Sequence, residues 1–146
     1  MKSNTLRLKN KKGMTLLELT VVILVLLSLI SILFIGARAW KRGSDRAASI
    51  LQIRNVQQAV RSYSNMNAKN AGDTVATLQT EVFGSGKFIE IDPTAVGAKP
   101  HPAGTTYSYT IAAPTVIPNI GVLYMKTTGG TDFADFNPKD ADIKDW

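Results

Sequence analysis

The residue that stands out chemically is a carboxylate at the edge of a long apolar run near the N-terminus. Glu18 is followed by Leu19–Ala37, which carries no charged side chain. Insertion scales put a carboxylate at the centre of a membrane helix at roughly 2.5 to 3.5 kcal/mol, so such residues are functional candidates by default. We therefore take Glu18 as the first candidate site residue, an anion placed to bind a cation.

Side chains that could serve catalysis are scarce in the rest of the chain. There is no cysteine, so disulfides and thiolate chemistry are excluded. The single histidine, His101, lies between Pro100 and Pro102, and we expect it to be a solvated loop residue. No phosphate-binding loop, zinc-ligand spacing or paired-acid arrangement occurs. The sequence does not predict an enzyme.

Positive charge is concentrated at the N-terminus. Residues 1–13 hold five of the 17 Lys and Arg residues and none of the 11 Asp and Glu residues. The formal net charge of +6 therefore belongs mainly to a basic leader and does not by itself indicate a nucleic-acid partner. The later arginines are spread around their helix without an aromatic platform for bases, so no nucleic acid is expected.

The apolar run predicts a transmembrane helix. It is close to the roughly 20 residues that span a bilayer core, and a chain this small could hardly bury a helix that is apolar on all sides. Hydroxyls within the run can bond to their own helix backbone. The leader favours a cytoplasmic N-terminus, but a second basic cluster in Arg38–Arg46 weakens that bias and could contact anionic lipid headgroups.

Three interpretations of the N-terminus are open. It could be a simple signal anchor. It could be a secretory signal peptide cut after Ala37-Arg38-Ala39, although the apolar run exceeds the usual length of about 7–15 residues. It could also be cut between Gly13 and Met14, which would create an amine, largely cationic at neutral pH, one helical turn before Glu18. In that case an amine and a carboxylate could compensate each other, within one chain or between neighbours. The alternative for Glu18 is that its side chain reaches the membrane interface and pairs with Lys11 or Lys12 of its own chain.

The residues around the third cut resemble the N-terminal motif of type IV pilins and type II secretion pseudopilins. The motif runs Lys11-Lys12-Gly13-Met14-Thr15-Leu16-Leu17-Glu18 and continues into the apolar run, and the resemblance covers about residues 8–66. It implies that a prepilin peptidase cuts after Gly13, that Met14 becomes N-methylated, and that Glu18 directs subunit assembly. Met14 replaces the family's usual Phe. Ile35-Gly36 stands where many pilins carry a proline, at the point where the helix melts in the filament.

The expected fold is α+β and pilin-like: a long N-terminal helix, half transmembrane and half amphipathic, packed on a small antiparallel sheet. The expected segments are a leader, 1–13, which is removed; a transmembrane and filament-core half, 14–37; an amphipathic half, 38–66; and a globular head with an acidic tail, 67–146. One helical face of the amphipathic half is apolar and consists of Ile50, Ile53, Val56, Val60, Tyr63 and Met66.

Turn residues and alternation predict the elements of the head. A short helix carries Val75, Leu78 and Val82 and is capped by Asp73. Strands are expected at Lys87–Ile91, Thr106–Ala112 and Ile120–Lys126, with Tyr107, Tyr109 and Ile111 on one face of the second. Pro114 and Pro118 predict a wide connection between the last two strands.

The acidic tail, Thr131–Trp146, allows several interpretations. The ordinary one is a solvated acidic surface. Another is a calcium site, because calcium takes about six to eight oxygen ligands; no EF-hand pattern is present, and the candidate ligands are Asp132, Asp135, Asp140 and Asp142. A third is contact with the basic Arg38–Arg46 segment of a neighbouring subunit.

We therefore expect a prepilin, a structural subunit of a type IV pilus or a type II secretion pseudopilus, in which Glu18 pairs with the N-terminal amine of a neighbour. The lack of a cysteine pair favours the pseudopilin. The expected partners are itself and other pilin-like subunits in a helical filament, the prepilin peptidase, an inner-membrane assembly platform and membrane lipid. The expected location is the bacterial inner membrane, by a single-pass helix with the head outside the cytoplasm, and then a periplasmic pseudopilus or cell-surface pilus. The alternative is a monomeric membrane-anchored or secreted ligand-binding domain.

Overall fold

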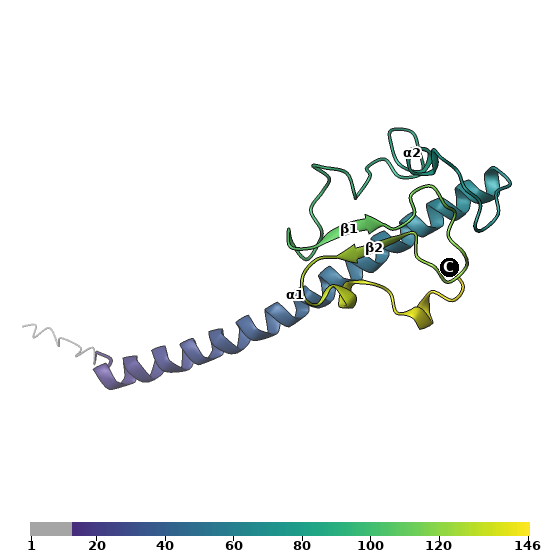
Figure 1. The fold of residues 1–146 in the computed structure, drawn as a ribbon. Helices are drawn as coiled ribbons and strands as arrows, with labels where there is room; N and C mark the ends of the chain where they lie inside the picture. Colours follow the sequence, from purple (N-terminus) through teal and green to yellow (C-terminus); the bar gives the residue numbers. More distant parts are fainter. Residues whose placement is uncertain (1–12) are drawn as a thin grey trace, which may run out of the picture. The chain divides into compact units, whose positions relative to one another are not determined.

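The computed structural model describes residues 13–146, so the predicted leader lies outside the described residues except for Gly13. The elements are α1 (Leu16–Met66), α2 (Leu78–Val82), β1 (Ser108–Ile111) and β2 (Met125–Thr128), followed by two 3-10 helices, η1 (Phe133–Phe136) and η2 (Asp140–Asp142). This is the predicted α+β layout of a long helix packed on a small antiparallel sheet (Figure 1). The chain divides into two units, one ending at Ala39 and the other comprising Trp40–Trp146.

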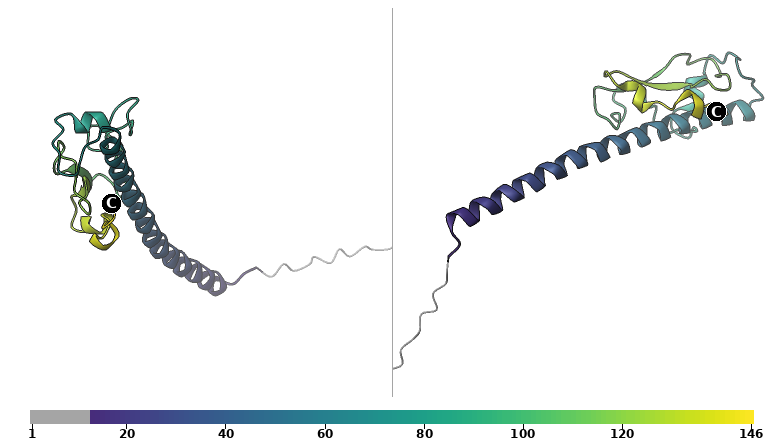
Figure 2. Two further views of the ribbon diagram at one scale, coloured as in Figure 1. Left: turned by 90° about the vertical axis from the view of Figure 1, so that its right-hand side faces the viewer. Right: turned by 90° about the horizontal axis from the view of Figure 1, so that it is seen from below.

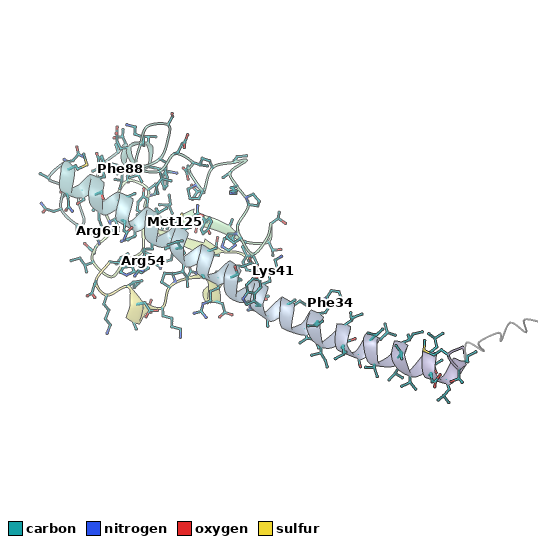
Figure 3. The ribbon with its side chains drawn as sticks, turned by 180° about the vertical axis from the view of Figure 1, so that it is seen from behind. Phe34, Lys41, Arg54, Arg61, Phe88 and Met125 are labelled. Carbon is teal, nitrogen blue, oxygen red and sulfur yellow. The ribbon has the colours of Figure 1, made fainter. Side chains whose placement is uncertain are left out.

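In the first unit, the part of α1 up to Ala39 is exposed at every residue. Figure 3 shows its side chains projecting on all sides of the ribbon, with Phe34 labelled. As expected, hydroxyl groups in this part of α1 donate hydrogen bonds to backbone carbonyls of the same helix. Thr20 Oγ1 donates to Leu17 O at 2.9 Å, and Ser28 Oγ donates to Val25 O at 2.8 Å. By length and composition this helix could cross a membrane.

In the second unit, which we call the head, the sheet, α2 and the C-terminal segment lie along one side of α1, as both views of Figure 2 show. The predicted apolar face of α1 packs into the hydrophobic core of the head at Ile53, Val56 and Val60, each at most 1% exposed. Met66 was wrongly placed in this face. It is 76% exposed because α1 ends there and the chain turns at Ala68, which has a φ of 49°.

The sheet consists of two antiparallel strands, with Tyr109 opposite Thr127 and Thr110 opposite Lys126. Tyr109 and Thr127 are buried, whereas Thr110 and Lys126 are exposed. Alternation therefore predicted β1 correctly. The wide connection between the strands is also present, at residues 112–124.

The last strand begins later than predicted, at Met125 rather than Ile120. The reason is a side chain from α1. Gln57 Nε2 donates to Val122 O at 3.1 Å, and Tyr124 N donates to Gln57 Oε1 at 2.9 Å. The backbone groups that a neighbouring strand would have bound are thus satisfied by one amide, and Gly121, with a φ of 79°, bends the chain before them.

Two other predicted features of the head are wrong. Lys87–Ile91 is not a strand, because only one isolated bridge forms, between Phe83 and Ile89. Asp73 does not cap α2: its carboxylate accepts a hydrogen bond from Asn70 N at 2.7 Å, and α2 begins five residues after Asp73, at Leu78. Both differences arise because local hydrogen bonds in turns compete with regular structure.

Candidate functional site

The N-terminus of α1 is closed by a reciprocal pair of hydrogen bonds between Thr15 and Glu18. Thr15 N donates to Glu18 Oε2 at 2.8 Å, and Glu18 N donates to Thr15 Oγ1 at 3.3 Å. Thr15 O also accepts the first helical bond, from Leu19 N at 3.1 Å. This is a capping box, which satisfies two amides that would otherwise lack partners at the start of a helix.

The capping box was missed in the sequence, although its signal is there. Thr-Leu-Leu-Glu directly before an apolar run is the Thr-x-x-Glu pattern of a helix start. In this structure Glu18 therefore caps the helix that carries it, in addition to being a candidate to bind a cation. Its Oε1 makes no hydrogen bond within the described part of the chain. That oxygen can accept a further donor while the cap stays closed.

The predicted cleavage site lies just outside the helix. Gly13 and Met14 are exposed and precede α1, and no atom would meet a Cβ at Gly13 within 4 Å. The structure thus places Gly13, Met14 and Glu18 within one short segment, with the peptide bond between the first two in non-helical backbone. A peptidase needs an extended, accessible segment of this kind.

A second cluster joins the acidic tail to the start of the head portion of α1. Arg42 Nη2 lies 2.5 Å from Asp132 Oδ2 and 2.8 Å from Asp135 Oδ2. Tyr107 also donates its hydroxyl to Asp132. This hydrogen bond, and secondly Arg42, lower the pKa of Asp132. The basic segment was predicted to meet acidic tails of neighbouring subunits, but at Arg42 the acidic partners come from the same chain.

The four calcium candidates do not share one location in the described residues. Asp132 and Asp135 converge on the Arg42 guanidinium, while Asp140 and Asp142 lie on η2. In residues 13–146 no group of three or more His, Asp or Glu side chains is arranged to hold a metal. Calcium binding therefore remains a prediction that draws no support from this arrangement.

His101 is not solvated, contrary to expectation. It is 4% exposed and lies among the sheet, η1 and α1. Its Nε2 is 3.0 Å from Ser49 Oγ and 3.2 Å from Thr127 Oγ1, and Ala103 N donates to its Nδ1 at 3.1 Å. Flanking prolines suggested an exposed loop, and nothing local to His101 showed that the loop folds inward.

The close approach of Ser49 and His101 does not have the arrangement of a nucleophilic pair. Ser49 is 0% exposed and donates its hydroxyl proton to Phe136 O at 3.0 Å, away from the imidazole. A nucleophile must give that proton to the base and must reach a substrate. The pair is instead part of a buried polar network.

The head also has an open groove of about 770 Å³ along α1, beside the C-terminal segment. The Arg54 guanidinium lies 4.6 Å from the ring centroid of Trp146, and Arg61 Nη2 donates to Trp146 O at 3.0 Å. Figure 3 labels both arginines on the stretch of α1 that the C-terminal segment approaches. The remaining lining is mostly polar and includes Gln58, Ser62 and Asn65.

Comparisons with known proteins give no relative: no protein-family model, no curated protein and no solved structure matches this chain.

Proposed function

We propose that this chain is a prepilin-like subunit of a type IV pilus or type II secretion pseudopilus. In this proposal the chain is cut after Gly13 and polymerises through the N-terminal part of α1. Glu18 then pairs with the Met14 amine of a neighbouring subunit. The bacterial inner membrane holds the subunit before assembly, with the head outside the cytoplasm.

The observation that carries the proposal is the state of Glu18 at the start of an exposed apolar helix. One carboxylate oxygen caps the helix and the other has no hydrogen bond in the described chain. A carboxylate beside hydrocarbon is costly unless a cation reaches it. The capping box lies wholly after the proposed cut, so cleavage leaves the acceptor in place and adds a cationic amine to the same segment.

The apolar surface of α1 supports the same proposal. Large side chains such as Leu24, Leu33 and Ile35 are about 70% exposed in the isolated chain, at 68%, 70% and 72%. Such a surface requires lipid or other helices around it. A helix that is a membrane anchor before assembly and part of a filament core afterwards satisfies the requirement in both states.

Mass analysis of the mature N-terminus tests the processing step. A chain that begins at N-methylated Met14 is expected. A chain that begins at Trp40 would indicate signal peptidase, and an intact Met1 would indicate a simple anchor. Either of these results would contradict the proposal.

Substitutions at Glu18 separate charge pairing from capping. Glu18→Gln keeps an acceptor for Thr15 N, since Gln also serves in capping boxes, but it removes the charge. Glu18→Ala removes both. We expect both variants to be lost from purified filaments while the head stays folded, and Thr15→Ala, which keeps the charge, to be incorporated. Incorporation of Glu18→Gln at the wild-type level would show that the charge is not needed.

The alternative, a monomeric anchored or secreted ligand-binding domain, has one observation in its favour, the groove beside Arg54 and Arg61. Two guanidinium groups in an open groove suit an anionic ligand. Under this alternative, Arg61→Gln would abolish binding of an anionic ligand, and the chain would remain monomeric with or without Glu18.

A further inference from the structure

His101 connects four segments of the head that are far apart in the sequence. Its ring contacts Ser49 on α1 and Thr127 on β2 through Nε2. The ring also packs edge-on against Phe136 of η1, with centroids 5.5 Å apart, and at a tilt against Tyr109 of β1, with centroids 4.7 Å apart. The loop that carries His101 is closed by Gly104 N, which donates to His101 O at 2.8 Å.

The hydrogen bonds determine which nitrogen of His101 carries the proton. Ala103 N can only donate, so Nδ1 must be the unprotonated acceptor. The proton of the neutral ring is therefore on Nε2, where the oxygens of Ser49 and Thr127 can accept it. Ser49 is free to accept because its own proton goes to Phe136 O. The network is complete only with a neutral imidazole.

A second proton on this ring would have no acceptor. It would have to bind Nδ1, where it would face the amide proton of Ala103, so two donors would oppose each other. No carboxylate forms an ion pair with the ring among residues 13–146. Asp45 on α1 favours the charged ring from a distance, but burial outweighs it and lowers the pKa of His101.

The remaining groups around the His101 ring would not compensate the positive charge of a protonated imidazole. Tyr107 and Tyr109 pack against it and are neutral at these pH values, because the ordinary pKa of tyrosine is about 10 and is raised further by the Asp132 hydrogen bond at Tyr107 and by burial at Tyr109. The hydroxyl of Tyr109 is buried and makes no hydrogen bond to another described residue, so it does not compensate a charge on the ring. Arg42, Asp132 and Asp135 are bound to one another at the surface.

We propose that His101 is an acid-sensitive lock, whose neutral form holds its loop, β2 and η1 on α1 and whose protonation releases the loop. The lock is a property of the head alone and does not depend on filament assembly. If the head faces the outside of the cytoplasm, as proposed above, it would meet external pH directly. Acid would then loosen the surface formed by residues 92–104 and η1.

The direction in which stability changes with pH follows from proton linkage. The folded head disfavours the proton, so the contribution of His101 to stability is complete above its unfolded pKa, near 6.5, and is lost as the pH falls below that value. Between the unfolded pKa and the lowered folded pKa, the opening equilibrium rises by about tenfold per pH unit. The pKa of Asp132 is lowered from its ordinary 3.8, chiefly by the Tyr107 hydrogen bond, so Asp132 is charged where this loss of stability begins, near pH 6.5.

The test uses the full chain in detergent micelles and ¹⁵N-labelled histidine. The chain has a single histidine, so its ring signals need no assignment. We expect ring shifts at neutral pH of the tautomer with the proton on Nε2, and a titration midpoint below 6.5. The opposite tautomer, or an ordinary midpoint, would overturn the proposal without any substitution.

Hydrogen exchange separates local release from general unfolding. After correction for the intrinsic pH dependence of exchange, the amides of Ala103 and Gly104 should lose about tenfold protection per pH unit below 6.5. The amide of Tyr124, which donates to Gln57 Oε1 elsewhere in the head, should keep its protection over the same pH range. Equal loss at Tyr124 would mean that the whole head unfolds, and that there is no lock.

Two variants complete the design. His101→Gln cannot be protonated, so it should remove the pH dependence at Gly104 even if it lowers protection at every pH. Asp45→Asn removes the one carboxylate that favours the charged ring, so it should lower the midpoint of His101 further. An unchanged pH dependence in His101→Gln would assign the effect to another group and overturn the proposal.

Discussion

Thr15 and Glu18 hold each other across the first turn of α1, with the Thr15 amide 2.8 Å from Glu18 Oε2 and the Glu18 amide 3.3 Å from Thr15 Oγ1. Both residues follow the Gly13–Met14 bond, so cutting that bond does not disturb the pair. Glu18 can therefore fix the start of its own helix and keep one oxygen for the cation that we propose a neighbouring subunit supplies. These two roles require different properties, an acceptor for the first and a charge for the second.

Removal of the Thr15 hydroxyl should fray the first turn of α1. Thr15→Ala loses the capping bond to Glu18 N, which is expected to cost about 1 kcal/mol of local helix stability. Amide exchange at residues 16–19 in detergent micelles measures this. Thr20→Ala is the matched control, because its hydroxyl bonds back to Leu17 O inside the helix and caps nothing. Equal exchange in the two variants would contradict a capping role.

Gln57 should be among the most sensitive positions of the head. It is 2% exposed, and Gln57→Leu would leave both Val122 O and Tyr124 N without partners. An unsatisfied buried polar group costs about 1–3 kcal/mol, so the free energy of unfolding should fall by roughly 2–6 kcal/mol. Gln58→Leu, at the exposed neighbouring position, should change it by less than about 0.5 kcal/mol. Denaturant titration of both variants measures the difference.

Gly129 and Gly97 form a matched pair of glycines. Their φ angles are 83° and 82°, but a Cβ at Gly129 would clash with Thr106 O, whereas a Cβ at Gly97 would meet no atom within 4 Å. Gly97→Ala should cost only the left-handed backbone penalty, about 1–2 kcal/mol. Gly129→Ala should cost clearly more, because the turn after β2 must move. Equal unfolding midpoints would show that the turn adapts freely.

The acid stability of the head should depend on Tyr107. Its hydrogen bond is the main cause of the lowered pKa of Asp132, so Tyr107→Phe should bring that pKa back toward its usual value. A lowered carboxyl pKa contributes stability that is present above the unfolded pKa, about 3.8, and lost as the pH falls below it. Tyr107→Phe should therefore flatten the loss of stability as the pH falls below about 3.8.

The control for this prediction is Asp135→Asn. Asp135 contacts the same arginine, but its side chain is 58% exposed, and exposed ion pairs contribute about 0–1 kcal/mol. Its removal should leave the acid transition almost unchanged. Carboxyl carbon shifts followed through the acid range report Asp132 directly. A normal Asp132 titration in the unsubstituted chain would contradict the assignment.

Much of the fold could be predicted from local patterns. The apolar run, the stripe at Ile53, Val56 and Val60, and the alternation around Tyr109 each follow from the period of one helix or strand. The strand predicted from Ile120 begins only at Met125, because Gln57, distant in the sequence, takes the hydrogen bonds of Val122 and Tyr124. Strand pairing depends on which groups compete for a backbone edge, and that is not visible within a window of neighbours.

The sequence by itself determined the arrangement of the N-terminal motif. Gly13, Met14, Thr15 and Glu18 all lie within residues 13–18, so their relationship depends on local backbone geometry alone. Only the tertiary structure decided the surroundings of His101 and the partners of Arg42. Ser49 and His101 are 52 positions apart, and Arg42 and Asp132 are 90 apart. Such contacts form only when the head packs on α1, because burial then selects which polar groups must satisfy one another.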